Sequence, residues 1–177
     1  TGEEHKVAPN IVQRNFSPDK TNTILSTDVT ELRYEQGQKA YLSAFKDLRT
    51  KEIVQYSLSP TPSINLVLDG LPELLKGLRK RSVIVHSDQG VQYTSGAFRS
   101  LLLQYGIKQS MSRKGNCLDN SPIESFFGHL KDEVDLKRCK NFKEVSKEIE
   151  KYMYYYNNDR PQWNLKQKTP AEARVKL

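Results

Sequence analysis

The chain has 177 residues, 36% hydrophobic and 28% charged, so it can bury one core but is short for two. Its 28 Lys and Arg exceed its 21 Asp and Glu, and the net charge of +7 favours an anionic partner without identifying it. The two cysteines belong to no Cys–His cluster, and apolar runs such as 83–85 are far shorter than the ~20 residues that span a bilayer. These counts exclude a disulfide framework, a zinc finger and a membrane helix, and a cytoplasmic setting fits best.

The first half of the chain predicts a polar lead followed by a strand meander. Residues 1–20 are expected to be a linker from a region that precedes this chain. β-Branched residues and a turn at Gly37 then predict three strands, at Thr23 to Leu32, Ala40 to Phe45 and Ile53 to Leu58. Because the connections are short, neighbouring strands should pair antiparallel.

The second half alternates helical and strand patterns. Apolar spacing predicts helices over 63–78, from Phe98 to Tyr105, from Ser121 and from Phe142, and short strands at Ser82 to His86 and Ile107 to Met111. Residues 112–120 have no periodicity and are expected to form a mobile loop. The order predicts an α/β fold with a mixed five-stranded sheet, three antiparallel strands then parallel strands, flanked by helices.

Two aspartates are candidate site residues, one inside a predicted strand and one directly after another. Asp28 lies inside the first strand, where alternation places it on one face with Ser26 and Thr30. That face is either an exposed polar surface or the place of a metal ligand. Asp88 directly follows a buried strand, at the carboxyl edge where α/β sheets place ligand chemistry, although Asp beside Gly90 is also common turn chemistry.

A third acid, Glu124, has two competing interpretations. Ser121 and Glu124 fit an S-x-x-E capping box at a helix start. Glu124 also lies off the apolar stripe, on a face shared with Gly128 and Lys131, where a phosphate backbone could approach. Three carboxylates on three elements are what a pair of divalent cations catalysing phosphoryl transfer would need.

Several motifs in order resemble one family. The segments are Thr27 to Glu31, His86 to Tyr93, Ser112 to Phe127, Tyr155 to Pro161 and Thr169 to Glu172. They resemble the integrase-type (DDE) core of orfB-type transposases of bacterial insertion sequences, which are relatives of retroviral integrases. The 35 residues between Asp88 and Glu124 match the acidic spacing of that family.

The resemblance implies an RNase H-like catalytic core with a C-terminal helical tail over residues 21–177. It implies that Asp28, Asp88 and Glu124 form a catalytic triad that binds two Mg²⁺ ions, for which Mn²⁺ can substitute. The implied activity is DNA strand cleavage and 3′-OH strand transfer at insertion-sequence ends. The implied partners are end and target DNA in the bacterial nucleoid, bound by a homo-oligomer.

Residues expected to contact DNA are Arg113, Lys114, Lys131, Asn157 and Arg160. Full-length relatives carry a helix-turn-helix region ahead of the core, so we expect specific end recognition to lie outside this chain. Cations are spread along Lys76, 79–81, Arg113, Lys114, Lys131 and 137–140, which predicts binding mostly through phosphate contacts.

Two other functions remain open from the residues alone. One is an RNase H-like nuclease that only hydrolyses, and the other is a catalytically silent DNA- or protein-binding module. Asp47, Asp119 and Asp132 are further acids that we expect to be structural. His86 is expected to be packed or hydrogen-bonded within its strand rather than to bind a metal.

Overall fold

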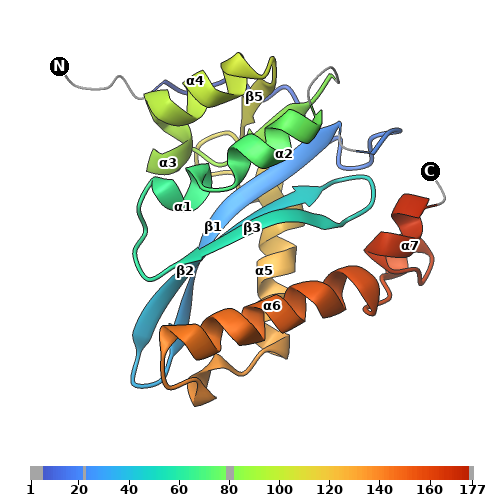
Figure 1. The fold of residues 1–177 in the computed structure, drawn as a ribbon. Helices are drawn as coiled ribbons and strands as arrows, with labels where there is room; N and C mark the ends of the chain where they lie inside the picture. The colour runs from blue at the N-terminus through green and yellow to red at the C-terminus, as the bar shows by residue number, and fades with distance from the viewer. Residues whose placement is uncertain (1–5, 22, 79–81, 176–177) are drawn as a thin grey trace.

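The computed structural model describes residues 6–21, 23–78 and 82–175, and its centre is a mixed five-stranded sheet (Figure 1). The strands are β1 (Ile24–Tyr34), β2 (Gln38–Asp47), β3 (Ile53–Ser59), β4 (Ile84–Ser87) and β5 (Lys108–Met111). Their order is β3-β2-β1-β4-β5; β1, β2 and β3 pair antiparallel, and β4 is parallel to both β1 and β5. The predicted mixed five-stranded sheet is therefore confirmed.

The antiparallel half follows from one tight turn. Gly37 adopts a φ of 87°, a left-handed conformation that suits glycine, and its N–H donates to the Tyr34 carbonyl over 3.2 Å. The turn sets the β1–β2 register, in which Asp28 stands opposite Ala44. β1 then also pairs with β4, so Asp28 lies on the central strand of the sheet.

Seven α-helices and three 3₁₀ helices surround the sheet in the part of the chain that the structure describes. The α-helices are α1 (Asn65–Leu68), α2 (Leu71–Leu78), α3 (Val91–Thr94), α4 (Gly96–Gln104), α5 (Ser121–Glu133), α6 (Phe142–Asn158) and α7 (Pro170–Val175). The 3₁₀ helices are η1 (Cys117–Asn120), η2 (Leu136–Arg138) and η3 (Trp163–Leu165). The single helix predicted over 63–78 is wrong, because extended Asp69 and Gly70, with a φ of 77°, divide it into α1 and α2.

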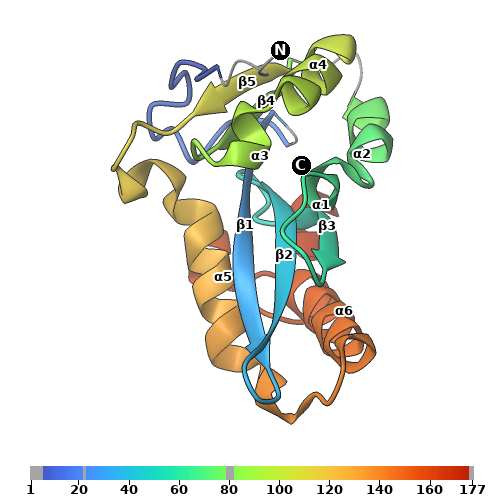
Figure 2. The ribbon, with the colours of Figure 1, turned by 90° about the vertical axis from the view of Figure 1, so that its left-hand side faces the viewer.

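Two apolar clusters hold the helices against the sheet. The first joins β1, β2 and β3 to α5 and α6, and within it the rings of Phe126 and Tyr156 meet edge to face with centroids 4.7 Å apart. The second joins β4 and β5 to the helices from α1 to α4. In Figure 2, α5 runs alongside β1 while α3 and α4 lie over β4 and β5. Asp28 and Glu124 therefore lie on elements packed into the first cluster, and Asp88 directly follows β4, which is packed into the second.

The polar segment 6–20 contains no helix or strand, yet it packs against the edge of the sheet. The Ile11 N–H donates to Ser110 Oγ over 3.1 Å, the Met111 N–H donates to the Pro9 carbonyl, and Val12 is buried. The part of the expected linker that the structure describes is thus held by the domain. No helix within the described ranges is both long and apolar enough to cross a membrane.

Candidate active site

Asp28 is a half-buried carboxylate in the middle of the sheet. Its neighbours Ser26 and Thr30 on the same strand face are buried, so the interpretation of this face as an exposed polar surface is wrong. One oxygen, Oδ1, accepts the Val29 N–H over 2.7 Å. Burial, together with the negative charges of Asp88 and Glu124, raises the pKa of Asp28 from 3.8 to about 7. The ionised form of the Asp28 carboxylate is therefore destabilised in the folded protein.

Asp88 is brought beside Asp28 by the parallel pairing of β1 and β4. Ser26 of β1 pairs with His86 of β4, and each aspartate follows its paired residue by two positions. Both acids consequently lie at the carboxyl end of this strand pair. Asp88 Oδ1 also accepts the Gly90 N–H over 2.8 Å, so the turn role expected from the sequence is present as well.

Glu124 comes to the same place from the first turn of α5. The residue before α5 is Asn120, and it makes no side-chain capping bond, so the predicted Ser121–Glu124 capping box is wrong. Glu124 is exposed, as are Gly128 and Lys131 on the same helix face. Burial and the charge of Asp88 raise the pKa of Glu124. An added Cβ at Gly128 would meet nothing within 4 Å, so this face is open to a large ligand.

Asp88 and Glu124 line one open cleft of about 680 Å³. Residues that line this cleft are Asp88, Gln89, Gly90, Ser112, Arg113, Lys114, Gly115, Asn116, Asn120 and Glu124. Asp28 does not line the cleft, but its charge interacts with the charges of Asp88 and Glu124, which do.

The donor set suits a hard divalent cation, although the site is not preassembled. No group of three His, Cys, Asp or Glu side chains among the described residues is arranged to hold a metal ion as it stands. The acids supply only oxygen ligands, which Mg²⁺ prefers. Burial and repulsion by Asp88 and Glu124 raise the pKa of Asp28, and a bound cation would offset both effects. The residues therefore fit the metal that the resemblance implies.

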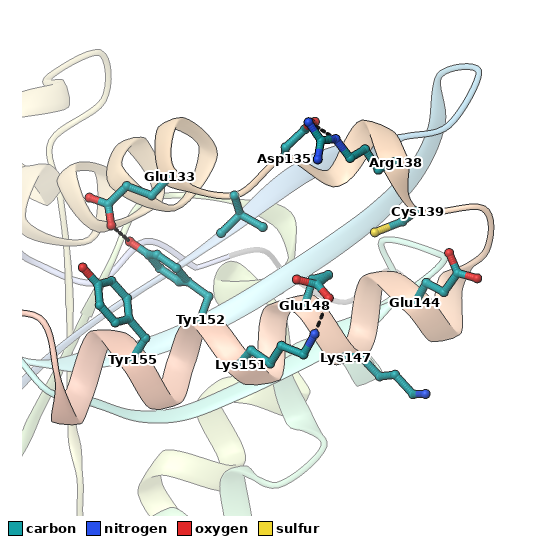
Figure 3. A pocket seen from close by; sticks show the side chains of 11 residues that line it. Glu133, Asp135, Arg138, Cys139, Glu144, Lys147, Glu148, Lys151, Tyr152 and Tyr155 are labelled. Atoms are coloured by element: carbon teal, nitrogen blue, oxygen red, sulfur yellow. Dashed lines mark hydrogen bonds and ion pairs between the residues drawn. The ribbon is translucent and has the colours of Figure 1, made fainter.

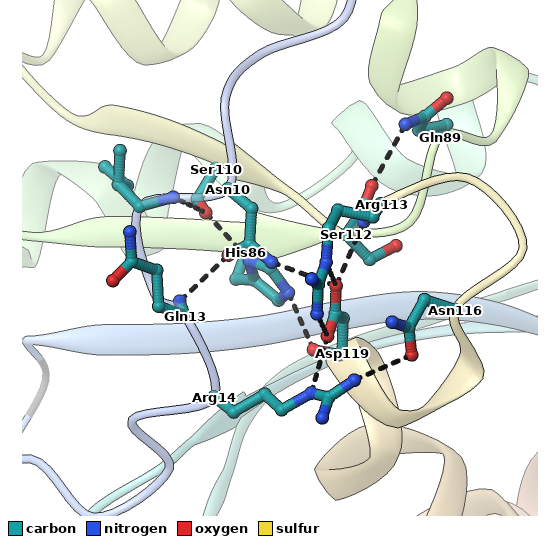
Figure 4. Close-up of polar contacts among 11 residues, drawn as sticks. Asn10, Gln13, Arg14, His86, Gln89, Ser110, Ser112, Arg113, Asn116 and Asp119 are labelled. Carbon is teal, nitrogen blue, oxygen red and sulfur yellow. Dashed lines mark hydrogen bonds and ion pairs between the residues drawn. The ribbon is translucent and has the colours of Figure 1, made fainter.

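The loop expected over 112–120 is wrong at its C-terminal end, where Cys117–Asn120 form η1 and Asp119 and Asn120 are buried. Arg113 donates from Nε and Nη2 to the carboxylate of Asp119 over 2.9 and 3.0 Å (Figure 4). Asp119 is buried, and its ion pair with Arg113 holds its pKa well below the usual range. Arg113 thus has a protein partner without DNA, whereas Lys114 is exposed at the cleft.

Of the other predicted DNA contacts, only Lys131 faces the acids. Its charge acts on Asp28. Asn157 instead bonds the backbone of Ile53 on β3, accepting over 2.9 Å and donating over 3.0 Å. Arg160 pairs with Glu133 at 2.6 Å. These contacts give Asn157 and Arg160 roles within the fold, and the predicted cations at 79–81 lie outside the described residues.

A second cavity, of about 570 Å³, lies between the end of α5 and α6 (Figure 3). Tyr152 donates to Glu133 across it over 3.2 Å, and Lys151 pairs with Glu148 along its α6 side. None of the three acids lines this cavity. We therefore place the chemistry in the cleft that Asp88 and Glu124 line.

The structural roles expected for Asp47, Asp119 and His86 are confirmed, because each of these residues is buried and bonded within the fold. Asp47 is fully buried and accepts the Thr50 hydroxyl over 3.0 Å. Asp119 is the partner of Arg113, and Asp132 is exposed on α5. His86 is buried, with Nδ1 2.9 Å from Ser110 Oγ.

Three residues near the site were not predicted as site residues, although Tyr93 and Asn120 lie within the motifs that resemble the family. Asn120 is buried beside β1, and the Tyr93 hydroxyl lies 3.2 Å from Thr27 Oγ1, next to Asp28. The Lys46 ammonium is buried under α5 and donates to the Pro122 carbonyl over 2.9 Å. A lysine in a strand and an Asp-Asn pair before a helix are ordinary patterns, so only the packing reveals these contacts.

Comparison with known proteins gives one consistent family. Two family models, both described as integrase core domain, match residues 18–117 and 105–170. A transposase-like protein of Haemophilus influenzae is 41% identical over 175 residues, which cover 98% of this chain and 81% of that protein. The putative transposase InsK of insertion sequence element IS150 from Escherichia coli is 43% identical over 98% of this chain, but the chain spans only 62% of it.

Solved structures agree on the fold. The HTLV-2 integrase catalytic core domain in complex with magnesium superposes with a TM-score of 0.67 at 19% identity, covering 86% of this chain and 96% of that one. A simian T-cell lymphotropic virus intasome gives a TM-score of 0.71 at 17% identity, covering 96% of this chain and 59% of that one. The predicted RNase H-like fold is confirmed.

Proposed function

The chain belongs to the integrase core domain family, as the catalytic core of an insertion-sequence transposase, and we propose that it cuts DNA at the ends of its element and joins each 3′-OH to target DNA. One observation carries the proposal: Asp88 and Glu124 line one open cleft, and Asp28 on the neighbouring strand β1 lies close enough to both to interact with them by charge. Phosphoryl transfer needs such a cluster of oxygen ligands.

The three acids would hold divalent cations, with Mg²⁺ as the natural ion and Mn²⁺ as a substitute. When bound, such ions activate the attacking hydroxyl and stabilise the leaving oxygen. The magnesium named for the HTLV-2 integrase core supports this choice, as does the all-oxygen donor set here. Asp88 is oriented by its bond to the Gly90 N–H, and Asp28 by its bond to the Val29 N–H.

Cations beside the acids would bind the DNA backbone. Lys114 lines the cleft and Lys131 acts on Asp28 from the exposed face of α5. Gly128 lies between Glu124 and Lys131 on that face and leaves room for a phosphate to approach. These contacts recognise phosphate rather than base edges, so we assign recognition of the element's end to the rest of the protein.

The protein would act as a homo-oligomer on chromosomal DNA in the bacterial nucleoid. The HTLV-2 integrase core is described in dimeric and trimeric forms, and the simian virus relative is described as an intasome. Two element ends must be joined to one target, which a multimer can hold together.

The test is strand cleavage and joining by the whole protein with duplexes carrying its insertion-sequence end, in Mg²⁺. Asp28→Asn, Asp88→Asn and Glu124→Gln should each abolish both steps, since each removes a negative ligand at nearly constant volume. Asp132→Asn, an exposed acid on α5, is the matched control and should stay active. Cleavage without joining would identify a nuclease that only hydrolyses, and binding without cleavage a silent DNA-binding module.

A further inference from the structure

We propose that Asp119 and Asn120 are positioning residues: this buried pair sets the distances between the elements that carry the three acids, and Arg14 ties the pair to the N-terminal segment. The proposal deepens the proposed function and rests on it. Asp119 and Asn120 are 1% and 2% exposed and immediately precede α5, the helix of Glu124.

Asn120 links the start of α5 to β1. Its Oδ1 accepts the Ser26 hydroxyl over 2.9 Å, and its Nδ2 donates to the Thr27 carbonyl at 3.4 Å. Thr27 directly precedes Asp28, so Asn120 contacts β1 next to the first acid. The same residue begins the turn from which Glu124 projects. A buried amide with both ends bonded is held in one orientation.

Asp119 links the same junction to β4. Its main-chain oxygen lies 2.8 Å from His86 Nε2, and because a carbonyl can only accept, Nε2 carries the proton and donates. His86 precedes Asp88 by two residues on the strand that ends at that acid. Two consecutive residues therefore contact both strands that bear the aspartates and begin the helix that bears the glutamate.

The Asp119 carboxylate extends this junction to both flanking segments (Figure 4). It accepts Nε and Nη2 of Arg113 on the cleft side, and Arg14 Nε over 2.8 Å and Asn10 Nδ2 over 3.0 Å from the N-terminal segment. Arg14 Nη2 also donates to Asn116 Oδ1 over 2.9 Å. Charge-assisted hydrogen bonds to a buried carboxylate are among the stronger polar contacts. The segment around Arg14 therefore helps to hold Asp119 in place.

The functional consequence concerns metal binding. The three acids are coupled but not preassembled, so their affinity for a cation depends on how firmly their elements are held. Loss of residues that orient metal ligands typically lowers metal affinity 10–100-fold, roughly. We therefore expect Asn120 and Arg14 to affect ion binding although neither contributes a ligand.

The experiment is a titration of the whole protein with Mn²⁺ alone, followed by electron paramagnetic resonance of the free ion, beside strand cleavage. Asn120→Ala should weaken Mn²⁺ binding by about tenfold or more, and Arg14→Met should weaken it in the same direction. Arg14→Met changes a side chain that is 42% exposed, so this variant stays informative if Asn120→Ala does not fold. The matched control is Arg138→Met, which removes another arginine–aspartate pair, of 2.9 Å, in η2, beyond the end of α5 opposite to Glu124.

The expected result is a loss of Mn²⁺ affinity in both junction variants and none in Arg138→Met. Folded junction variants that bind Mn²⁺ as tightly as the unsubstituted protein would overturn the positioning role. An unsubstituted protein that binds Mn²⁺ but neither cleaves nor joins DNA would instead overturn the proposed function. The two failures are therefore distinguishable.

Discussion

Replacing Asp28 with asparagine should stabilise the metal-free protein at neutral pH while it abolishes the chemistry. The pKa of Asp28 is raised from 3.8 to about 7 in the folded state, first by burial and then by Asp88 and Glu124. As pH rises between these values the unfolded chain loses its proton before the folded chain does, so the free energy of unfolding falls. At 1.36 kcal/mol for each pKa unit, the penalty at neutral pH is about 4 kcal/mol, and screening by solvent reduces it to roughly 2–4 kcal/mol.

Asparagine removes this penalty and keeps the shape of the side chain, including an oxygen that can accept the Val29 N–H. The assay is urea unfolding with a chelator at several values from about pH 4 to about pH 8. The unsubstituted protein should lose stability across this window, and Asp28→Asn should lose much less. Asp132→Asn, exposed on α5, should follow the unsubstituted protein.

Added Mg²⁺ should narrow or reverse the difference in free energy of unfolding between Asp28→Asn and the unsubstituted protein. An ion that binds only the folded state stabilises the unsubstituted protein more, because that protein retains all three carboxylate ligands. An Asp28→Asn variant that is no more stable than the unsubstituted protein at about pH 7 without metal would refute the reasoning. It would mean that neither burial nor the charges of Asp88 and Glu124 destabilise the carboxylate of Asp28 in the folded protein.

Three further predictions concern the cleft. A Cβ at Gly90 would lie 2.9 Å from Asp88 Oδ1, so Gly90→Ala should displace that carboxylate and slow DNA cleavage. An added Cβ at Gly77 would meet nothing within 4 Å, so Gly77→Ala is the control and should leave the cleavage rate unchanged. Equal cleavage rates for the two variants would contradict this prediction. Lys131→Ala should reduce the slope of log affinity against log salt by about one unit, and an unchanged slope would remove Lys131 from the DNA interface. Hydrogen exchange in residues 113–115, the exposed part of the expected loop, should be faster than in β4 without DNA and should slow when DNA binds; protection equal to that of β4 in the free protein would contradict the expected mobility.

The sheet could be predicted because its causes are local. β-Branched runs, short connections and the turn at Gly37 specify antiparallel neighbours, and these are properties of residues close in sequence. The stripes on α5 and α6 likewise predicted both helices. The break at Gly70 was missed because an apolar stripe continues across it, although the left-handed φ of Gly70 ends the first helix.

The identity of the acids was also within reach of the sequence. Local sequence patterns were enough to single them out. Asp28 is a charged residue inside a strand, Asp88 follows the end of a strand, and Glu124 lies off the apolar stripe of its helix. Whether they serve as turn, cap or ligand depends on neighbours far away in the chain. Pairing of Ser26 with His86 sets Asp28 beside Asp88, and the absence of a capping bond at the start of α5 leaves Glu124 free of that role.

The amino-acid sequence alone thus determined the five strands, the longer helices, the sheet class and the candidate acids, since these depend on periodicity and backbone preference. Only the tertiary structure decided that Arg113 pairs with Asp119, that Asn157 and Arg160 serve the fold, and that Arg14 reaches the junction before α5. A buried polar group must find a partner wherever the chain brings one, and the partners of Asp119 and Asn120 on β1, β4 and the N-terminal segment lie up to 109 residues away. No local pattern encodes such a choice.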